Sequence, residues 1–387
     1  MPQQIIKGRL VEALKTAASW AVDAGHDVHV PARSLQALRP RDGLTVTGSI
    51  QAGGRRTAGI NKYSRSIRRT LVLTLAAAVS LLAAAQHAEA ASGPISNPHI
   101  IAHLDFSRGQ TPENLALEPN GSADVTFAEA AQVARVSLDG QVRILAQLPA
   151  PTGGAVCPFF GPFLGKAAFT GGIVRDHHGS LYVALCTGSP DLQGIWRISQ
   201  NGSASRIAAL PAGGIPNGMA LDERHGFVYV ADSLLSIIWR VSIADGTVVA
   251  WASGPQLAPS GGLGANGLKL HGGAVWVSNT QLGTLLQIPI RRDGSAGPIE
   301  TIASGLAGID DFAFTGPGRS ASVLAAINFS STVVLIRPDG SEQTVLTAAD
   351  GLSNPSSIAI RGSTVYVLSA AYLTHNDPNV LLASLRR

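Results

Sequence analysis

Residues 215–242 decide the fold, because they contain three short apolar segments in a row. The segments are Ile215-Pro-Asn-Gly-Met-Ala-Leu-Asp222, Phe227-Val-Tyr-Val-Ala-Asp-Ser233 and Ser236-Ile-Ile-Trp-Arg-Val-Ser242. β-branched and aromatic residues bounded by Gly, Asn, Asp or Ser are typical of strands joined by tight turns. Variants of these segments recur along the chain, so the sequence is made of repeated copies of one unit of strands.

The copies repeat with the period of propeller blades. From about residue 98 the chain divides into six units of roughly 42 to 50 residues. Several units have Asp-Gly or Asn-Gly between their third and fourth strands, where tight hairpins need positive φ angles. The first strands of the units are expected at residues 113–117, 172–174, 215–222, 266–270, 310–314 and 356–360.

The sixth unit has no fourth strand at the C-terminus. The segment Ile100–Leu104 lies ahead of the first unit and has the composition of an outer strand. If this strand completes the last blade, hydrogen bonds close the ring and no open edge remains. The sequence therefore predicts an all-β fold, a six-bladed β-propeller whose ring is closed by an N-terminal strand.

The composition agrees with this fold and argues against a nucleic-acid partner. Of 387 residues, 43 are Gly and only 14% are charged, which suits short strands and turns. Residues 1–90 hold 12 of the 29 Lys and Arg but 5 of the 25 Asp and Glu. Residues 91–387 keep 17 basic and 20 acidic residues, a net charge of −3. The part that folds is mildly acidic, so no phosphate-backbone partner is expected.

The segment before residue 91 has the form of a secretory signal peptide. Arg65, Arg68 and Arg69 precede the apolar run 71–85, and Ala88-Glu89-Ala90 supplies a small-residue cleavage site. We expect a secreted or periplasmic protein with no membrane association after cleavage. The alternative is an uncleaved N-terminal anchor, although the apolar run is short for a membrane span.

Residues 1–60 precede this signal and contain no strand repeat. Met219 is the only Met besides Met1, so a start at an internal ATG is excluded. We expect an unstructured extension, or a misassigned start with translation beginning at a non-ATG codon near residue 60. The predicted organisation is thus 1–60 extension, 61–90 signal peptide and 91–387 propeller.

The chain has two cysteines, Cys157 and Cys186. In an exported protein such a pair suggests a disulfide. Two buried thiols are the alternative, because the sequence does not give the Cα separation that a bridge requires. No CxxC or His–Cys cluster suggests zinc.

At one position of the repeat, most units have a residue whose side chain carries an oxygen atom. In a propeller the first strand of each blade lines the central channel, and the starting ends of these strands open on one face. The residue two before the first large apolar position of each strand is, in order, Glu113, Gly171, Asn217, Asn266, Asp310 and Ser356. Four of these, Glu113, Asn217, Asn266 and Asp310, carry side-chain oxygens suited to a hard cation.

Electrostatics favours a metal ion at this position. A Glu and an Asp in one narrow channel repel each other unless one is protonated or a cation lies between them. Ca²⁺ takes six to eight oxygen ligands, so four protein ligands leave positions for water and substrate. The alternative is that each Asn-Gly is only a turn and that Glu113 caps a strand. An error of one residue in the register would substitute Asn114 or Asp311.

The four residues resemble a known calcium site. Glu113, Asn217, Asn266 and Asp310, in this order and in separate blades, look like the site of the gluconolactonase (regucalcin-like) superfamily, to which paraoxonase and diisopropylfluorophosphatase are related. The segment 216–222 is similar to that family's recurrent phrase. The resemblance covers roughly residues 98–385, and it implies a six-bladed propeller with Ca²⁺ in its channel. Glu113 stands in Pro-Glu-Asn-Leu, where the family has Glu-Gly-Pro.

The resemblance implies a calcium-dependent hydrolase of lactones or related esters, in which the cation polarises the carbonyl. Asp310 would orient or activate the attacking water, or attack directly. A non-catalytic propeller that binds a sugar or a protein on its channel face is the alternative, and a metal-free synthase or lyase is a third reading. We expect a small-molecule substrate and a monomer.

Other polar residues have simpler explanations. His177 and His178 fall in a turn and are expected to face solvent. Asp232, Asn279 and Asn328 follow second strands and are expected to brace the next turn by side-chain-to-backbone bonds.

Overall fold

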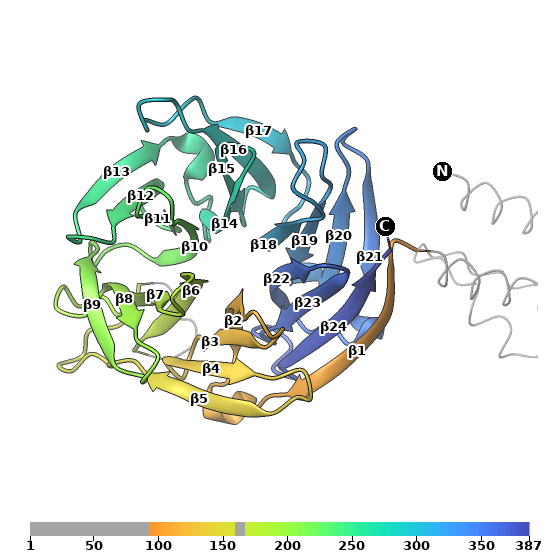
Figure 1. Cartoon of the computed structure of the whole chain (residues 1–387), viewed down its shortest axis with the longest axis horizontal. Coiled ribbons are helices and arrows are strands. Elements are labelled where there is room, and N and C mark those ends of the chain that lie inside the picture. The colour runs from red at the N-terminus through yellow and green to blue at the C-terminus, as the bar shows by residue number, and fades with distance from the viewer. Residues whose placement is uncertain (1–92, 159–166, 387) are drawn as a thin grey trace, which may run out of the picture. The chain divides into compact units, whose positions relative to one another are not determined.

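A computed structural model describes residues 93–158 and 167–386. They form six four-stranded antiparallel sheets arranged as blades in a ring, with the six inner strands at its centre (Figure 1). The predicted all-β, six-bladed propeller is confirmed. The remaining described elements are 3-10 turns: η1 (Phe106–Arg108), η2 (Pro255–Leu257), η3 (Asn328–Ser330) and η4 (Ala348–Asp350).

The chain builds the blades in sequence order, each from its inner to its outer strand, except that the outer strand of blade 6 is the N-terminal strand β1. Blade 1 consists of β2 (Pro112–Leu117), β3 (Ala123–Phe127), β4 (Gln132–Val136) and β5 (Val142–Gln147). Blade 2 consists of β6 (Phe169–Arg175), β7 (Leu181–Cys186), β8 (Gly194–Ile198) and β9 (Ala204–Ala209). Blade 3 consists of β10 (Pro216–Asp222), β11 (Phe227–Asp232), β12 (Ile237–Ser242) and β13 (Val248–Ser253). Blade 4 consists of β14 (Ala265–His271), β15 (Ala274–Asn279), β16 (Thr284–Pro289) and β17 (Glu300–Ala303). Blade 5 consists of β18 (Ile309–Phe314), β19 (Val323–Ile327), β20 (Thr332–Ile336) and β21 (Glu342–Leu346). Blade 6 consists of β22 (Pro355–Arg361), β23 (Thr364–Ser369), β24 (Asn379–Leu385) and β1 (Ile95–His103).

The N-terminal strand closes the ring as predicted. In blade 6 the strand order is β1-β24-β23-β22, so β1 is the outer strand (Figure 1). Ile95 pairs with Leu385 and His103 with Asn379. The last blade thus contains strands from both ends of the propeller segment, and the hydrogen bonds between β1 and β24 close the ring.

The core consists of clusters in which adjacent blades pack face to face. Between blades 3 and 4, for example, Tyr229, Leu268 and Val277 lie in one buried cluster. Between blades 6 and 1, Val125 and Tyr366 do the same. Burying one such side chain stabilises the fold by about 1.5–3 kcal/mol, so the alternating apolar positions of the strands determine how the blades stack.

The six inner strands share an irregularity at their starting ends. Each shows a register shift against its neighbour within the first few residues, for example between Pro216 and Met219 in β10 and between Ile309 and Phe312 in β18. Bulges of this kind redirect side chains. Here they lie where the sequence predicted the channel-facing ligands.

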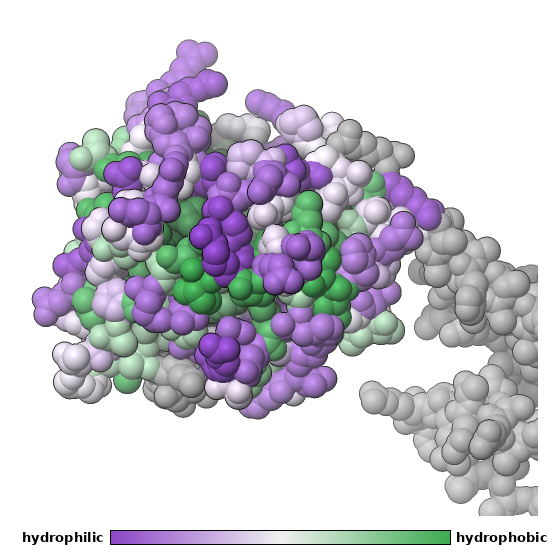
Figure 2. Space-filling model, turned by 60° about the horizontal axis from the view of Figure 1, so that its bottom comes forward, coloured by the Kyte–Doolittle hydropathy of each residue, from purple (hydrophilic) through white to green (hydrophobic). Residues whose placement is uncertain are grey.

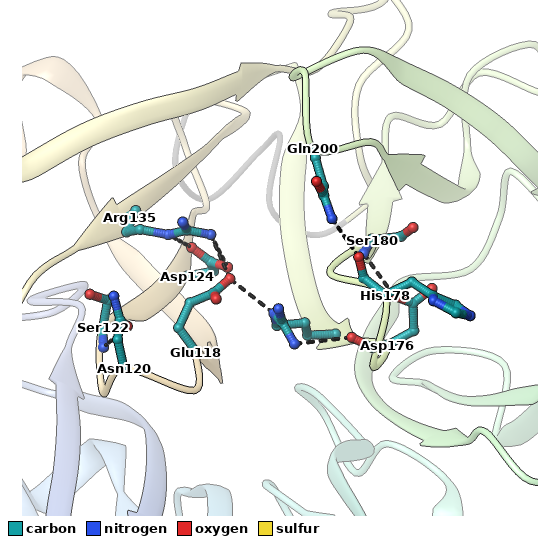
Figure 3. A network of polar contacts seen from close by, with 10 residues as sticks. Glu118, Asn120, Ser122, Asp124, Arg135, Asp176, His178, Ser180 and Gln200 are labelled. Carbon is teal, nitrogen blue, oxygen red and sulfur yellow. Dashed lines mark hydrogen bonds and ion pairs between the residues drawn. The ribbon is translucent and has the colours of Figure 1, made fainter.

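The opposite ends of the inner strands carry an ionic network that joins blades 1 and 2 (Figure 3). Glu118, just beyond β2, accepts bonds from Arg135 at 2.5 Å and from Arg175 of β6 at 2.9 Å. Arg135 also contacts the buried Asp124 at 2.7 Å. The two acidic residues of the network are paired with its two arginines, so the network joins blades 1 and 2. The predicted ligands lie at the opposite ends of the inner strands.

Cys157 and Cys186 form a disulfide with a Cα–Cα distance of 5.3 Å, so the predicted pair is confirmed. It joins the β5–β6 connection to the end of β7. The bridge lies in an apolar cluster with Phe169, Ile215 and Tyr372.

Removing this bridge by Cys157→Ser/Cys186→Ser is expected to lower the free energy of unfolding by about 2–4 kcal/mol, because the bridge restricts the unfolded chain over 29 residues of sequence. Urea unfolding under oxidising conditions measures the difference. The reduced wild type should match the double variant. Equal urea midpoints for oxidised and reduced wild type would contradict the prediction.

The outer strands form the rim of the ring. Figure 2 brings forward the lower edge of Figure 1, where β5 and β1 lie, and shows hydrophobic patches between hydrophilic ones. Exposed large apolar side chains on and beside β5 are Leu138, Val142 and Ile144. Charged residues also stand on the exposed outer strands, as Glu300 does on β17, and this discourages edge-to-edge pairing.

The predicted extension 1–60 and signal peptide 61–90 lie outside the described residues and stay predictions. Within residues 93–158 and 167–386, no helix has the length and apolarity needed to cross a membrane.

Candidate metal centre

The four predicted ligands all lie at the bulged starts of inner strands and are all buried. Glu113 in β2 is 3% exposed, Asn217 in β10 1%, Asn266 in β14 3% and Asp310 in β18 7%. Adjacent inner strands approach closely, because a Cβ on Gly218 would lie 2.2 Å from the carbonyl oxygen of Asn266. The starts of β10 and β14, which carry Asn217 and Asn266, are therefore in close contact.

The charge of Glu113 affects the ionisation of Asp310. Burial, followed by the negative charges of Glu113 and Asp311, raises the pKa of Asp310 well above its ordinary value, and hydrogen bonds from Asn328 and Asn266 partly offset this. Burial also raises the pKa of Glu113 to about 8, with Tyr372 opposing and Asp311 adding to the shift. The channel therefore contains two carboxyls that are costly to ionise together without a cation.

Neutral side chains also donate hydrogen bonds to each carboxyl. The Tyr372 hydroxyl donates to Glu113 Oε2 at 2.6 Å, and Asn328 Nδ2 donates to Asp310 Oδ2 at 3.2 Å. Tyr372 stands in the β23–β24 connection and is itself only 9% exposed. These donors orient the carboxyl groups but bring no positive charge.

The two amides are oriented by equivalent hydroxyls. Asn217 Nδ2 donates to Ser233 Oγ at 3.3 Å, and Asn266 Nδ2 donates to Thr280 Oγ1 at 2.9 Å. Ser233 and Thr280 each follow the second strand of the same blade as their Asn. Anchoring the NH₂ groups in this way leaves the amide oxygens as the free ends of the side chains.

The donor set fits a hard divalent cation. Two carboxylates can balance a charge of +2, and two amide oxygens add neutral ligands of the type that Ca²⁺ accepts. Residues 93–158 and 167–386 contain no group of three or more His, Cys, Asp or Glu that could hold a metal. The predicted ligand set differs from such a group, because two of its four members are Asn residues. All four offer oxygen ligands, which do not favour soft metals.

The other two positions of the register do not add ligands. Gly171 has no side chain, and a Cβ there would lie 3.3 Å from Asn217 Oδ1, so glycine leaves room for that amide. Ser356 donates to the carbonyl of Pro112 at 2.6 Å. It therefore joins blade 6 to blade 1.

The residues one position further along have different partners. Asp311 is ion-paired with Lys269 at 2.6 Å, and Asn114 Nδ2 donates to Asp311 Oδ2 at 3.3 Å. Both side chains are buried. Asn114 and Asp311, the residues that a one-residue shift of the register would select, thus contact each other. The acidic residues of the predicted register, Glu113 and Asp310, have no ion pair among the residues that the structure describes.

The turn residues behave mostly as predicted. His177 is exposed and pairs with Glu223. Asp232 Oδ1 accepts the backbone N–H groups of Leu234 and Leu235, and Asn279 accepts that of Leu282.

Asn328 is different from the other two turn residues. Its amide donates to Asp310 Oδ2 and to the carbonyl oxygen of Asn354. The prediction that Asn328 only braces a turn was therefore incomplete, because the bulge of β18 brings Asp310 within reach of it.

Sequence reasoning missed Tyr372, Lys269, Ser233 and Thr280. The last two could have been found, because they stand at equivalent places after the second strands of blades 3 and 4. Tyr372 lies in an irregular connection, and Lys269 stands on the inner strand of a single blade, where it contacts Asp311. Nothing repeats in the sequence at those two positions.

Similar folds are known, although no family model matches this sequence and no curated protein does. A gluconolactonase from Xanthomonas campestris is similar at 17% identity and a TM-score of 0.53, over 76% of this chain and 98% of that one. A calcium-binding protein, regucalcin, from Agrobacterium tumefaciens is similar at 15% identity and a TM-score of 0.55, over 76% and 96%. Virginiamycin B lyase from Staphylococcus aureus reaches 13% identity and a TM-score of 0.50, over 75% and 99%.

These likenesses define the class of protein by its fold. The described residues share the six-bladed propeller fold of these proteins, so the predicted resemblance is confirmed at the level of the fold. Enzymes of different chemistry share the fold, so the activity of this chain has to be argued from its own channel.

Proposed function

We propose that this protein is an exported, Ca²⁺-dependent hydrolase of lactones or related esters. The main support is that Glu113 and Asp310 are buried carboxyls close enough for the charge of Glu113 to raise the pKa of Asp310, while hydroxyls hold the NH₂ groups of Asn217 and Asn266. Similarity in fold to a gluconolactonase and to a calcium-binding regucalcin supports the same reading.

Glu113, Asn217, Asn266 and Asp310 would hold the cation. When bound, Ca²⁺ would act as a Lewis acid that polarises the substrate carbonyl and stabilises the developing oxyanion. Asp310 would orient the attacking water and accept its proton, or attack directly. Tyr372 would keep one oxygen of Glu113 in place.

The apolar cluster that includes Phe169, Ile215 and Tyr372 supports hydrolysis in a sheltered site, because excluding water strengthens electrostatic interactions. Export is supported by the signal-like segment before residue 91 and by the disulfide. We further propose a monomer that takes a small molecule as substrate.

The function is tested by assaying purified protein against lactones, aryl esters and organophosphates, with Ca²⁺ and with chelator. Hydrolysis that chelator abolishes and Ca²⁺ restores is the expected result. Hydrolysis that chelator does not affect overturns the calcium mechanism. Ligand binding without turnover of any substrate would favour the non-catalytic propeller.

Chelator is also expected to make stability depend on pH in a defined direction. The pKa of Glu113 rises from an ordinary 4.5 to about 8 on folding, so between these values the folded protein keeps a proton that the unfolded chain releases. The unfolded state then binds fewer protons, and the free energy of unfolding falls by a few kcal/mol as the pH rises through this window.

Added Ca²⁺ takes the place of that proton, so it should stabilise the protein more at about pH 8 than at about pH 5. Thermal unfolding at both pH values, with Ca²⁺ and with chelator, measures the effect. Glu113→Gln is the control and should remove most of the slope in chelator. A Ca²⁺ effect that is equal at both pH values would contradict the prediction.

A further inference from the structure

A second polar layer lies directly beside the metal centre, and Asp311 is its hub. Asp311 in blade 5 is 1% exposed. Its carboxylate accepts bonds from Lys269 Nζ at 2.6 and 2.7 Å, from Ser357 Oγ at 2.6 Å and from Asn114 Nδ2 at 3.3 Å. These donors come from blades 4, 6 and 1, so one carboxylate joins four of the six inner strands.

The packing of blade 4 accommodates this hub. A Cβ on Gly267 would lie 2.7 Å from both Asp311 Cα and Asp311 Oδ1. Those contacts are too short for any side chain at residue 267. The glycine therefore lets β14, which also carries Lys269, approach Asp311 in the β18 bulge closely.

The hub is adjacent in sequence to the two carboxyl ligands. Asn114 directly follows Glu113, and Asp311 directly follows Asp310. The hydrogen bond between Asn114 and Asp311 thus joins the two bulges that carry the acidic ligands, although blade 6 lies between blades 1 and 5. It fixes how far apart the backbones of Glu113 and Asp310 stand.

Lys269 also determines the charge of the channel. Its Nζ contacts both oxygens of Asp311, and its side chain is 27% exposed against 1% for Asp311. The ion pair is neutral as a unit. Without Lys269, the acidic groups Glu113, Asp310 and Asp311 would have no ion-pair partner within residues 93–158 and 167–386.

We propose that Lys269 and Asp311 form a positioning and charge-balancing pair for the metal centre. The pair sets the spacing of Glu113 and Asp310 and limits the unbalanced charge of the channel to two, so that the centre prefers a divalent to a trivalent cation. This inference rests on the proposed function, because it concerns the same centre.

The test compares Ca²⁺ with Tb³⁺, using cation-induced thermal shifts and Tb³⁺ luminescence. Lys269→Gln keeps a donor near Asp311 but removes the positive charge. The affinity for Tb³⁺ relative to Ca²⁺ should then rise by about tenfold or more, since one added charge within a few ångströms is strong in a partly buried site.

Asp311→Asn leaves Lys269 unpaired beside the centre, so Ca²⁺ affinity should fall by about tenfold or more. The double variant Lys269→Gln/Asp311→Asn is neutral again. It should return the Tb³⁺-to-Ca²⁺ ratio to within about threefold of the wild type, which is the non-additivity expected of a coupled pair. Arg319→Gln, an exposed charge removed elsewhere, is the control and should change neither affinity.

The outcomes separate this inference from the proposed function. A wild type that binds neither cation overturns both. A wild type that binds Ca²⁺, with an unchanged ratio in Lys269→Gln or unchanged Ca²⁺ affinity in Asp311→Asn, overturns the inference alone. If Lys269→Gln does not fold, Asp311→Asn still decides, because it lowers the negative charge and keeps a side chain of the same shape.

Discussion

Asp310→Asn is expected to reduce kcat/KM for the best lactone substrate by about 10³-fold, while the protein stays folded. The substitution keeps the shape of the side chain but removes both a charged ligand and the proposed base, and losses of roughly 10²–10⁴ are usual for a general base. Initial rates at saturating Ca²⁺ measure the effect, with Asp339→Asn, in an exposed turn, as the matched control.

The same variant should be more stable than the wild type in chelator. Asp310 is 7% exposed and its pKa is raised by burial and by neighbouring negative charges. A neutral amide removes that cost. A variant that loses activity and also unfolds more easily in chelator would indicate that Asp310 is structural. Full activity in Asp310→Asn would show that hydrolysis occurs elsewhere.

Glu113→Gln is expected to weaken Ca²⁺ binding by at least about 100-fold, because it removes one of the two charges that balance the cation. Losing a group that only supports a ligand already costs 10–100-fold. Titration calorimetry measures the affinity directly, and activity should be recovered in part at high Ca²⁺ concentration.

Glu300→Gln, on the exposed strand β17, is the matched control and should bind Ca²⁺ as the wild type does. Partial recovery by Ca²⁺ distinguishes Glu113 from Asp310, whose variant should not recover because it also lacks the base. Unchanged Ca²⁺ affinity in Glu113→Gln would remove this residue from the centre, and the predicted ligand set with it.

The repeat in the sequence was sufficient for the fold. The alternation of apolar residues in strands, the turn residues and the length of each unit are local properties of the sequence. Each occurs in all six units, so a wrong prediction in one unit can be corrected by comparison with the others. Even the closure of the ring by β1 could be predicted, since the sixth unit lacked a strand and Ile100–Leu104 supplied one.

The repeat also identified where a ligand set could lie, because equivalent positions of inner strands must face one channel. It could not identify the partners of those residues. Tyr372 reaches Glu113 from an irregular connection, and Asn328 reaches Asp310 from a neighbouring turn. Neither contact follows from periodicity.

The sequence by itself thus determined the six blades, the order of the strands and the level of the channel at which acidic and amide residues occur. Only the tertiary structure decided between neighbouring residues of one bulge. Asp310 and Asp311 are adjacent and chemically identical, yet Asp311 is ion-paired with Lys269 while Asp310 accepts a hydrogen bond from the neutral Asn328. A strand points successive side chains in different directions, and which direction meets a cationic partner depends on residues that come from other blades.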